Sequence, residues 1–188
     1  MRQQDAREVT QETLPPPKKM TLEEFLESDL EGYEYVKGEL IPMPPTSGAH
    51  GEISSNIHWY LYSHVRANQL GRVYIADTGF QVGERVLMPD IAFVSTARLP
   101  DDRQKAFSIP PDLAVEVVSR TDILHRVEEK AFAYLEAGTR MVWVLKPVSE
   151  TVMVYRSKTD IRVLTCEDTL TGEDVVEGFS CQVAQLFE

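Results

Sequence analysis

The chain has 188 residues and a formal net charge of -11, with 43% hydrophobic and 26% charged residues. A chain of this length can bury a proper core without metals or disulfides, and we expect one domain. The acidic balance argues against a protein that coats nucleic acid through bulk positive charge, but not against an enzyme that meets phosphates through a metal. The two isolated cysteines, Cys166 and Cys181, predict neither a disulfide framework nor a zinc site, and they fit a cytoplasmic protein with reduced thiols.

The N-terminal residues, 1–19, are polar and end in the run Pro15-Pro-Pro-Lys-Lys19. They contain no apolar segment, so we expect a disordered or extended tail and no secretory signal. No apolar run approaches the ~20 residues that a membrane helix needs, so no membrane partner is expected. We therefore divide the chain into a tail at 1–19 and a single domain at 20–188.

Periodicity and turn signals predict an α/β domain with many short strands. Its first part is expected to contain a helix starting at Thr21, a hairpin over 33–41, a helix over 50–68, and strands over 72–76, 79–82 and 86–94. Its second part is expected to contain a charged loop over 95–111, a strand over 113–119, a helix over 122–137, a strand over 141–145 and a hairpin over 152–164. The segment 113–145 is a βαβ unit, which favours a parallel strand pair with a right-handed crossover.

Local signals support several of these boundaries. Thr21 and Glu24 have the spacing of a capping box, which starts the first helix. The dipeptide Lys37-Gly38 predicts the tight turn of the first hairpin. Pro89 lies inside the strand over 86–94, so we expect that strand to be entered or bulged there.

One carboxylate, that of Glu116, lies in an apolar segment where burying its charge is unfavourable. Glu116 is in the middle of the apolar run Leu113-Ala-Val-Glu-Val-Val-Ser119, which is typical of a strand buried on both faces. A buried carboxylate costs several kcal/mol unless it is paired, protonated or bound to a cation. Glu116 therefore needs a partner from elsewhere in the chain.

Asp90 is the first candidate partner, because it starts the apolar segment Ile91-Ala-Phe-Val94. Taken alone, the pair Pro89-Asp90 is also typical of a turn cap. Two carboxylates in apolar strands repel each other, and a divalent cation is the simplest resolution. Oxygen ligands suit Mg²⁺ or Mn²⁺.

Lys130 is the second candidate partner. It lies three residues after Val127 and four before Tyr134, so it shares or borders the inner face of the helix over 122–137. Its ammonium group either reaches water while its stem packs, or it orients or deprotonates a water next to the two carboxylates.

Four further polar residues have two interpretations each. Ser119 either caps the turn after its strand or lies in the site. Arg126, in the first turns of the following helix, either meets phosphates or is solvated. Glu34 is either exposed by strand alternation or turned inward as a further metal ligand. His50, near the start of the long helix, is either structural or part of the site.

Taken together, these residues resemble the motif of the PD-(D/E)XK nuclease superfamily, and more narrowly the Uma-type family of "putative restriction endonucleases". The resemblance runs from about Thr21 to the C-terminus. Its matching segments are Tyr33-Glu34, Lys37-Gly-Glu-Leu40, His50, Pro89-Asp90, Val115-Glu-Val-Val-Ser119, Asp122, Glu129-Lys130, Tyr134-Leu-Glu-Ala-Gly138, Val142-Trp-Val144 and Glu177-Gly-Phe-Ser180. The chain departs from the superfamily at Val118, where a lysine is expected, and the family pattern points to Lys130 on the next helix instead.

The resemblance implies a restriction-endonuclease-like α/β fold, with a mixed central β-sheet flanked by α-helices, and a DNA endonuclease that uses Mg²⁺ or Mn²⁺. The implied catalytic residues are Asp90, Glu116 and Lys130. The implied metal ligands are Asp90, Glu116, Glu34 and the carbonyl group of Val117. The implied substrate-binding residues are His50, Arg126 and Ser119.

Enzymes of this fold often work as dimers because two strands must be cut, so a homodimer is an expected partner state. The hairpin over 152–164 is the candidate interface. Two alternative functions stay open. One is a catalytically silent nuclease fold that acts as a binding or regulatory module, which the net charge of -11 favours. The other is a metal-dependent phosphoesterase that acts on RNA or nucleotides.

Overall fold

The computed structural model describes residues 19–28, 30–119 and 122–188. Its helices are α1 (Leu22–Glu27), α2 (Gly48–Ala67) and α3 (Leu124–Glu136), with short 3-10 helices at Thr96–Arg98 and Val183–Leu186. Its strands are β1 (Tyr33–Val36), β2 (Glu39–Pro42), β3 (Gly71–Ile75), β4 (Phe80–Val82), β5 (Arg85–Leu87), β6 (Ile91–Ser95), β7 (Leu113–Val117), β8 (Met141–Lys146), β9 (Thr151–Tyr155), β10 (Ile161–Leu164), β11 (Thr169–Thr171) and β12 (Ser180–Gln182). The predicted tail at 1–19 lies, apart from Lys19, outside the described residues.

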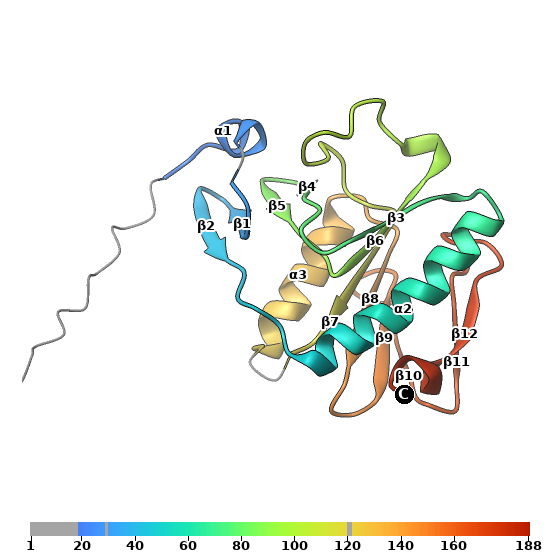
Figure 1. The fold of residues 1–188 in the computed structure, drawn as a ribbon. Coiled ribbons are helices and arrows are strands. Elements are labelled where there is room, and N and C mark those ends of the chain that lie inside the picture. The colour runs from blue at the N-terminus through green and yellow to red at the C-terminus, as the bar shows by residue number, and fades with distance from the viewer. Residues whose placement is uncertain (1–18, 29, 120–121) are drawn as a thin grey trace, which may run out of the picture.

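The central sheet is mixed. Its strand order is β10-β9-β8-β7-β6-β3, and β7 and β8 are parallel whereas the other neighbours are antiparallel. The parallel pair is connected through α3, which confirms the predicted βαβ unit. A second sheet, of order β2-β1-β5-β4, lies beside the first (Figure 1). The predicted fold class, an α/β fold with a mixed sheet flanked by helices, is confirmed.

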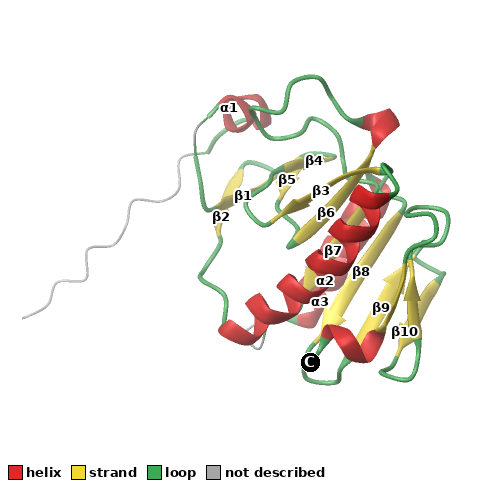
Figure 2. Cartoon of the chain, turned by 45° about the vertical axis from the view of Figure 1, so that its right-hand side comes forward, coloured by secondary structure: helices red, strands yellow, loops and turns green. Residues whose placement is uncertain are grey.

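The two faces of the central sheet carry separate cores, because strand side chains alternate between the faces. One face packs against α2 and the C-terminal segment, through residues that include Ile57, Leu61, Val115, Trp143 and Phe179. The other face packs against α3 and the second sheet, through residues that include Ala114, Val142, Ala131, Tyr134 and Phe80. The two long helices therefore lie on opposite sides of the sheet (Figure 2).

The local signals in the first part of the chain are borne out. Thr21 and Glu24 form a reciprocal capping box at the start of α1. The hairpin turns at Lys37 and Gly38, both of which have positive φ angles. The helix α2 begins at Gly48, slightly before the predicted start at residue 50, because the Ser47 side chain caps it by accepting a hydrogen bond from the His50 amide.

The predicted strand over 86–94 is wrong as a single strand. The chain forms β5 in the second sheet and β6 in the central sheet, and residues 88–90 connect them. Pro89 has no amide hydrogen to donate to a ladder. The amide of Met88 donates instead to the Glu34 carboxylate, at 2.8 Å. The strand is therefore interrupted where the backbone leaves one sheet for the other.

The crossover helix also begins later than predicted. We expected residues 122–137 to be helical, with Ile123 on the apolar stripe, but α3 starts at Leu124 and Ile123 is 57% exposed. Asp122 precedes the helix, and its carboxylate accepts a hydrogen bond from the Ser119 amide at 2.7 Å. Among the described residues, no helix combines the length and the apolarity that crossing a membrane requires.

Candidate active site

The register of two central strands places the two predicted carboxylates next to each other. In the antiparallel pair β6–β7, Ile91 is opposite Val115. Asp90, one residue before Ile91, therefore lies beside Glu116, one residue after Val115. The Val117 amide donates to the Asp90 Oδ2 atom at 2.7 Å, which fixes the Asp90 side chain against β7.

The helix α3 supplies two partners to Glu116. The Lys130 Nζ atom lies 2.9 Å from Glu116 Oε1 and 3.0 Å from Oε2. The Tyr134 hydroxyl group donates to Glu116 Oε1 at 2.9 Å, and Tyr134 is fully buried. Lys130 and Tyr134 are four residues apart, so they lie on the same face of α3. Three hydrogen-bonding contacts thus hold the Glu116 carboxylate.

Glu34 brings a third carboxylate from the second sheet. Its Oε1 atom lies 2.8 Å from Lys130 Nζ and accepts the Met88 amide at 2.8 Å. Its side chain is only 13% exposed, so Glu34 is turned inward and is not exposed by strand alternation. Lys130 therefore lies between Glu34 and Glu116 and balances part of their charge.

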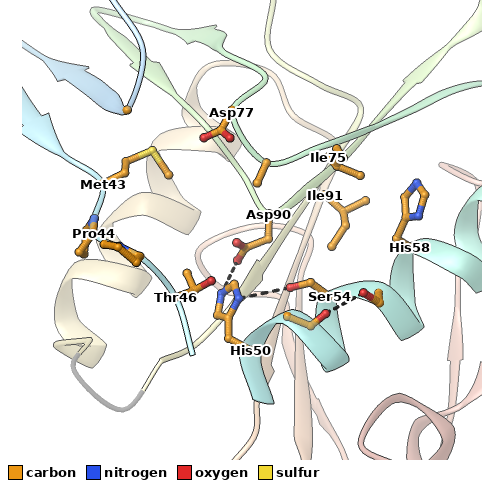
Figure 3. Close-up of a pocket in the computed structure, with 15 residues that line it drawn as sticks. Met43, Pro44, Thr46, His50, Ser54, His58, Ile75, Asp77, Asp90 and Ile91 are labelled. Carbon is orange, nitrogen blue, oxygen red and sulfur yellow. Dashed lines mark hydrogen bonds and ion pairs between the residues drawn. The ribbon is translucent and has the colours of Figure 1, made fainter. Parts of the chain in front are cut away.

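The helix α2 approaches the same group from the other face of the sheet. His50 is buried, and its Nε2 atom lies 3.3 Å from Asp90 Oδ2. The His50 Nδ1 atom is within 3.4 Å of the Ser54 hydroxyl group, one helical turn later. Figure 3 shows His50 between Asp90 and Ser54, with both contacts dashed. His50 therefore holds Asp90 rather than pointing freely into solvent.

The pKa values of Glu116, Lys130 and His50 are shifted from their ordinary values. Burial raises the pKa of Glu116 to about 7, assisted by the charges of Asp90 and Glu34 and opposed by Lys130. Burial alone would lower the pKa of Lys130, but Glu116 and Glu34 outweigh it and hold that pKa above its usual range. The hydrogen bond to Asp90 raises the pKa of His50 against the effect of burial. Perturbed groups of this kind gather at functional sites.

These groups line a pocket of about 600 Å³. Its walls are formed by the ends of β6 and β7, the face of α3 that carries Lys130, the start of α2 and the proline-rich segment 42–47. The lining residues that the sequence predicted as site residues are Glu34, His50, Asp90, Glu116, Val117, Ser119 and Lys130. A second pocket, of about 550 Å³, shares His50, Asp90 and the proline-rich segment with the first (Figure 3).

One predicted substrate-binding residue lies apart from the others. Arg126 is exposed on α3 and is not among the residues that line the pocket. Ser119 lies at the rim, where its amide donates to Asp122. The structure thus brings together seven of the eight predicted site residues and leaves Arg126 outside.

Sequence reasoning missed the role of Tyr134, which it assigned to the apolar stripe. The signal was its position four residues after Lys130, since a hydroxyl group at that spacing reaches what the lysine reaches. It also missed Ser54, which follows His50 by the same spacing. No signal in the sequence indicated that His50 contacts Asp90. The two residues belong to segments that are distant in the chain and that meet only when the protein folds.

The fit of a divalent cation depends on the chemistry of these donors. Within the described ranges, no group of three or more His, Cys, Asp or Glu side chains is arranged to hold a metal ion as it stands. Mg²⁺, however, usually keeps several waters and takes only one or two carboxylates. Asp90 and Glu116 are such a pair, and a bound cation would offset the cost of burying Glu116, which raises the pKa of this group to about 7. The residues present therefore fit Mg²⁺ or Mn²⁺.

A mixed sheet between helices, with acidic residues gathered where two central strands meet, defines the class of nuclease-like proteins with a restriction-endonuclease-like fold. The chain belongs to the family Uma2, described as "putative restriction endonuclease", which its sequence matches over residues 11–184. The crystal structure of a "putative nuclease" of the DUF820 family from Anabaena variabilis is similar, with a TM-score of 0.80 and 25% sequence identity. The match covers 89% of this chain and 97% of that one. A comparison with curated proteins found no match. These similarities support a nuclease-like function.

Proposed function

We propose that this protein is a metal-dependent DNA endonuclease that hydrolyses phosphodiester bonds. The observation that carries the proposal is the convergence of Asp90, Glu116 and Glu34 on one pocket around the buried ammonium group of Lys130. Placing three largely buried carboxylates next to each other is costly for stability, and groups of this kind gather at functional sites. The family suggests the reaction class, since it is described as "putative restriction endonuclease".

The proposed ligands of the cation are Asp90 and Glu116, with the Val117 carbonyl group and Glu34 as further oxygen donors. Asp90 presents its Oδ1 atom for this role, since its Oδ2 atom is already bound by the Val117 amide and by His50. When bound, a Mg²⁺ or Mn²⁺ ion makes water more acidic and stabilises the charge that develops on the phosphate.

Lys130 acts in this proposal as a cation and not as a base. Its pKa lies above the usual range, so the ammonium group stays charged at neutral pH. A charged lysine orients the attacking water and stabilises negative charge on the phosphate, whereas a proton acceptor would need a lowered pKa. This favours the orienting role over the deprotonating one.

The substrate contacts are proposed for Ser119, His50 and Arg126. Ser119 and His50 lie in the pocket wall, within reach of a phosphate next to the cleaved bond. Arg126, on the exposed side of α3, would meet the DNA backbone farther along. A homodimer that packs through the β9–β10 hairpin stays a prediction, which analytical ultracentrifugation tests.

Titration with Mn²⁺ tests the site, by calorimetry on the wild type and on Asp90→Ala and Glu116→Ala. We expect both variants to lose measurable Mn²⁺ binding and DNA cleavage. Asp160→Ala is the matched control, because Asp160 is an exposed acid in the β9–β10 turn. Unchanged Mn²⁺ affinity in both site variants would refute the metal site.

A substrate panel separates the alternatives. It contains duplex DNA, single-stranded DNA, RNA and free nucleotides, each with Mg²⁺ or Mn²⁺. Cleavage of DNA that disappears in Asp90→Ala supports the endonuclease. Hydrolysis confined to RNA or nucleotides would establish the phosphoesterase instead. Mn²⁺ binding without cleavage of any substrate would favour the silent binding module.

A further inference from the structure

The outward face of α2 carries a ladder of flat side chains. The ring of His58 stacks on Tyr62, with centroids 5.4 Å apart and planes inclined by 28°. The Arg66 guanidinium lies 5.8 Å from the centroid of the tyrosine ring and donates to its hydroxyl group at 2.8 Å. These three residues follow one another at intervals of four, so they form one row along the helix. We call this row, together with Trp59, the α2 ladder.

The α2 ladder exposes aromatic surface that the core does not use. Trp59 is 62% exposed and Tyr62 is 39% exposed. The rings of Trp59 and Tyr60 meet edge to face, with centroids 4.8 Å apart. Contiguous exposed apolar surface is a feature of binding sites, and aromatic rings contribute much of the energy there.

The charge of α2 differs from that of the whole chain. Among its 20 residues, the only carboxylate is that of Glu52, although the chain contains 30 acidic residues. Three of the four histidines of the chain lie on this helix, and Arg66 lies at the end of the α2 ladder. On a protein with a net charge of -11, α2 is therefore a surface that a polyanion can approach with little repulsion.

The α2 ladder is continuous with the candidate active site. The pocket of about 550 Å³ is lined by His58 at the start of the ladder, and by His50 and Asp90 where it meets the catalytic pocket. Ile75, at the end of β3, also lines this pocket and is 56% exposed. Figure 3 shows His58, Ile75 and Asp90 around this space. The pocket and the ladder therefore meet at His58, the ladder residue that lines the pocket.

We infer that this pocket and the α2 ladder bind unpaired nucleotides of a DNA strand next to the cleaved bond, an inference that rests on the proposed function. Bases stack on aromatic side chains without regard to sequence, and an arginine over the ring adds a cation–π contribution. The bases of an intact duplex are already stacked on one another, so they cannot use this surface. The substrate class is therefore single-stranded DNA, or DNA with a frayed or branched end.

Tryptophan fluorescence tests this inference without metal and without cleavage. The chain has two tryptophans, of which Trp143 is fully buried and Trp59 is exposed, so a change in emission on DNA binding reports Trp59. The probes, in the presence of a chelator, are an oligothymidylate strand of about 16 nucleotides, its duplex with the complementary strand, and an abasic strand of equal length. We expect quenching by the thymidylate strand, and binding of the duplex and the abasic strand at least about tenfold weaker.

Substitutions locate the binding surface. Trp59→Ala and Tyr62→Ala should each weaken binding of the thymidylate strand by about fivefold to a hundredfold, measured by fluorescence anisotropy of a labelled strand. Trp59→Phe, which keeps a ring, should recover most of the affinity. Val148→Ala, at an exposed position between β8 and β9, is the control and should change nothing. Equal binding of duplex and single strand, or unchanged affinity in both ladder variants, would overturn the inference.

Two further outcomes separate this inference from its alternatives. If Asp90→Ala abolishes Mn²⁺ binding and cleavage but the ladder variants have no effect on DNA, the proposed function stands and the ladder inference fails. If the ladder variants weaken DNA binding in chelator while no cleavage is found with any metal, the ladder stands and the nuclease fails. If Trp59→Ala converts a dimer to a monomer in ultracentrifugation without changing DNA affinity, the surface is an interface between copies, and the inference is overturned.

Discussion

The two long helices flank the same site but contribute to it in different ways. The helix α3 turns its polar groups inward, so that Lys130 and Tyr134 both reach the buried Glu116. The helix α2 brings His50 to the site, against Asp90, and turns Trp59 and Tyr62 outward. One helix therefore sets the charge of the site, while the other holds Asp90 in place and presents a surface beside it. Four substitutions test this division.

The largest effect is expected for Lys130→Met on α3. It leaves Glu116 and Glu34 without their shared cation in a buried site, so the free energy of unfolding should fall by about 3–5 kcal/mol at pH 8. Cleavage should fall by about 10²–10³-fold. Urea unfolding and a DNA cleavage assay measure the two effects. The control is Lys158→Met, which makes the same chemical change in an exposed ion pair with Glu136 and should leave the unfolding midpoint unchanged.

The next effect is a pH dependence that originates in Glu116. Its pKa in the folded protein is about 7, against an ordinary value of 4.5, so the folded state keeps a proton that the unfolded state has released. This contribution to stability is complete below pH 4.5 and is lost as the pH rises through about 7. From pH 5 to pH 8 the wild type should lose roughly 3 kcal/mol relative to Glu116→Gln, which cannot ionise. Urea unfolding measures this change. The prediction is contradicted if the difference in unfolding free energy between the two proteins is the same at pH 5 and at pH 8.

A smaller effect is expected on the α2 side. His50→Ala removes the contact with Asp90 but leaves the charged groups of Glu34, Glu116 and Lys130 in place. Mn²⁺ affinity should therefore fall by about 10–100-fold while the fold stays intact. Calorimetric titration with Mn²⁺ measures it. His64→Ala is the matched control, because this α2 histidine contacts the Glu177 carbonyl group at 2.8 Å and takes no part in the pocket. Equal losses of Mn²⁺ affinity in His50→Ala and His64→Ala would show that the contact between His50 and Asp90 has no specific effect on the site.

The smallest effect is expected for Tyr134→Phe. It removes one hydrogen bond to Glu116 while Lys130 keeps both carboxylate oxygens engaged, so unfolding should become easier by about 1.5 kcal/mol. Tyr155→Phe provides the comparison, since that buried hydroxyl group donates only to a methionine sulfur at 3.5 Å, and its removal should cost less. The difference between the two variants in urea unfolding isolates the contribution of the Glu116 contact.

Much of the fold could be predicted from the sequence, because caps, turns and apolar periodicity are local. Thr21 with Glu24, the turn at Lys37, and the βαβ unit around Glu116 all depend on residues close in the chain. Pro89 indicated a bulge or a strand start near this point, but the partner of the Met88 amide could not be predicted, since it is the carboxylate of Glu34, 54 residues earlier.

The candidate site shows the same limit. The need of Glu116 for partners predicted Asp90 and Lys130, because a buried charge must be compensated whatever the fold. The pairing of His50 with Asp90 depends on how α2 packs across the sheet, which no local pattern encodes. The role of Tyr134 could not be predicted, because its apolar ring fits the hydrophobic periodicity of the helix. That pattern is the same whether or not the hydroxyl group binds another residue.

The place of the lysine on α3, and not on β7, has a consequence for how such proteins tolerate insertions. A strand residue is fixed by its ladder, whereas a helix residue turns with its helix by about 100° for each position gained or lost. One residue inserted in α3 before Lys130 would carry the ammonium group away from Glu116 even though every strand kept its register. The chemistry of this site is therefore sensitive to the length of a helix that contributes no ligand.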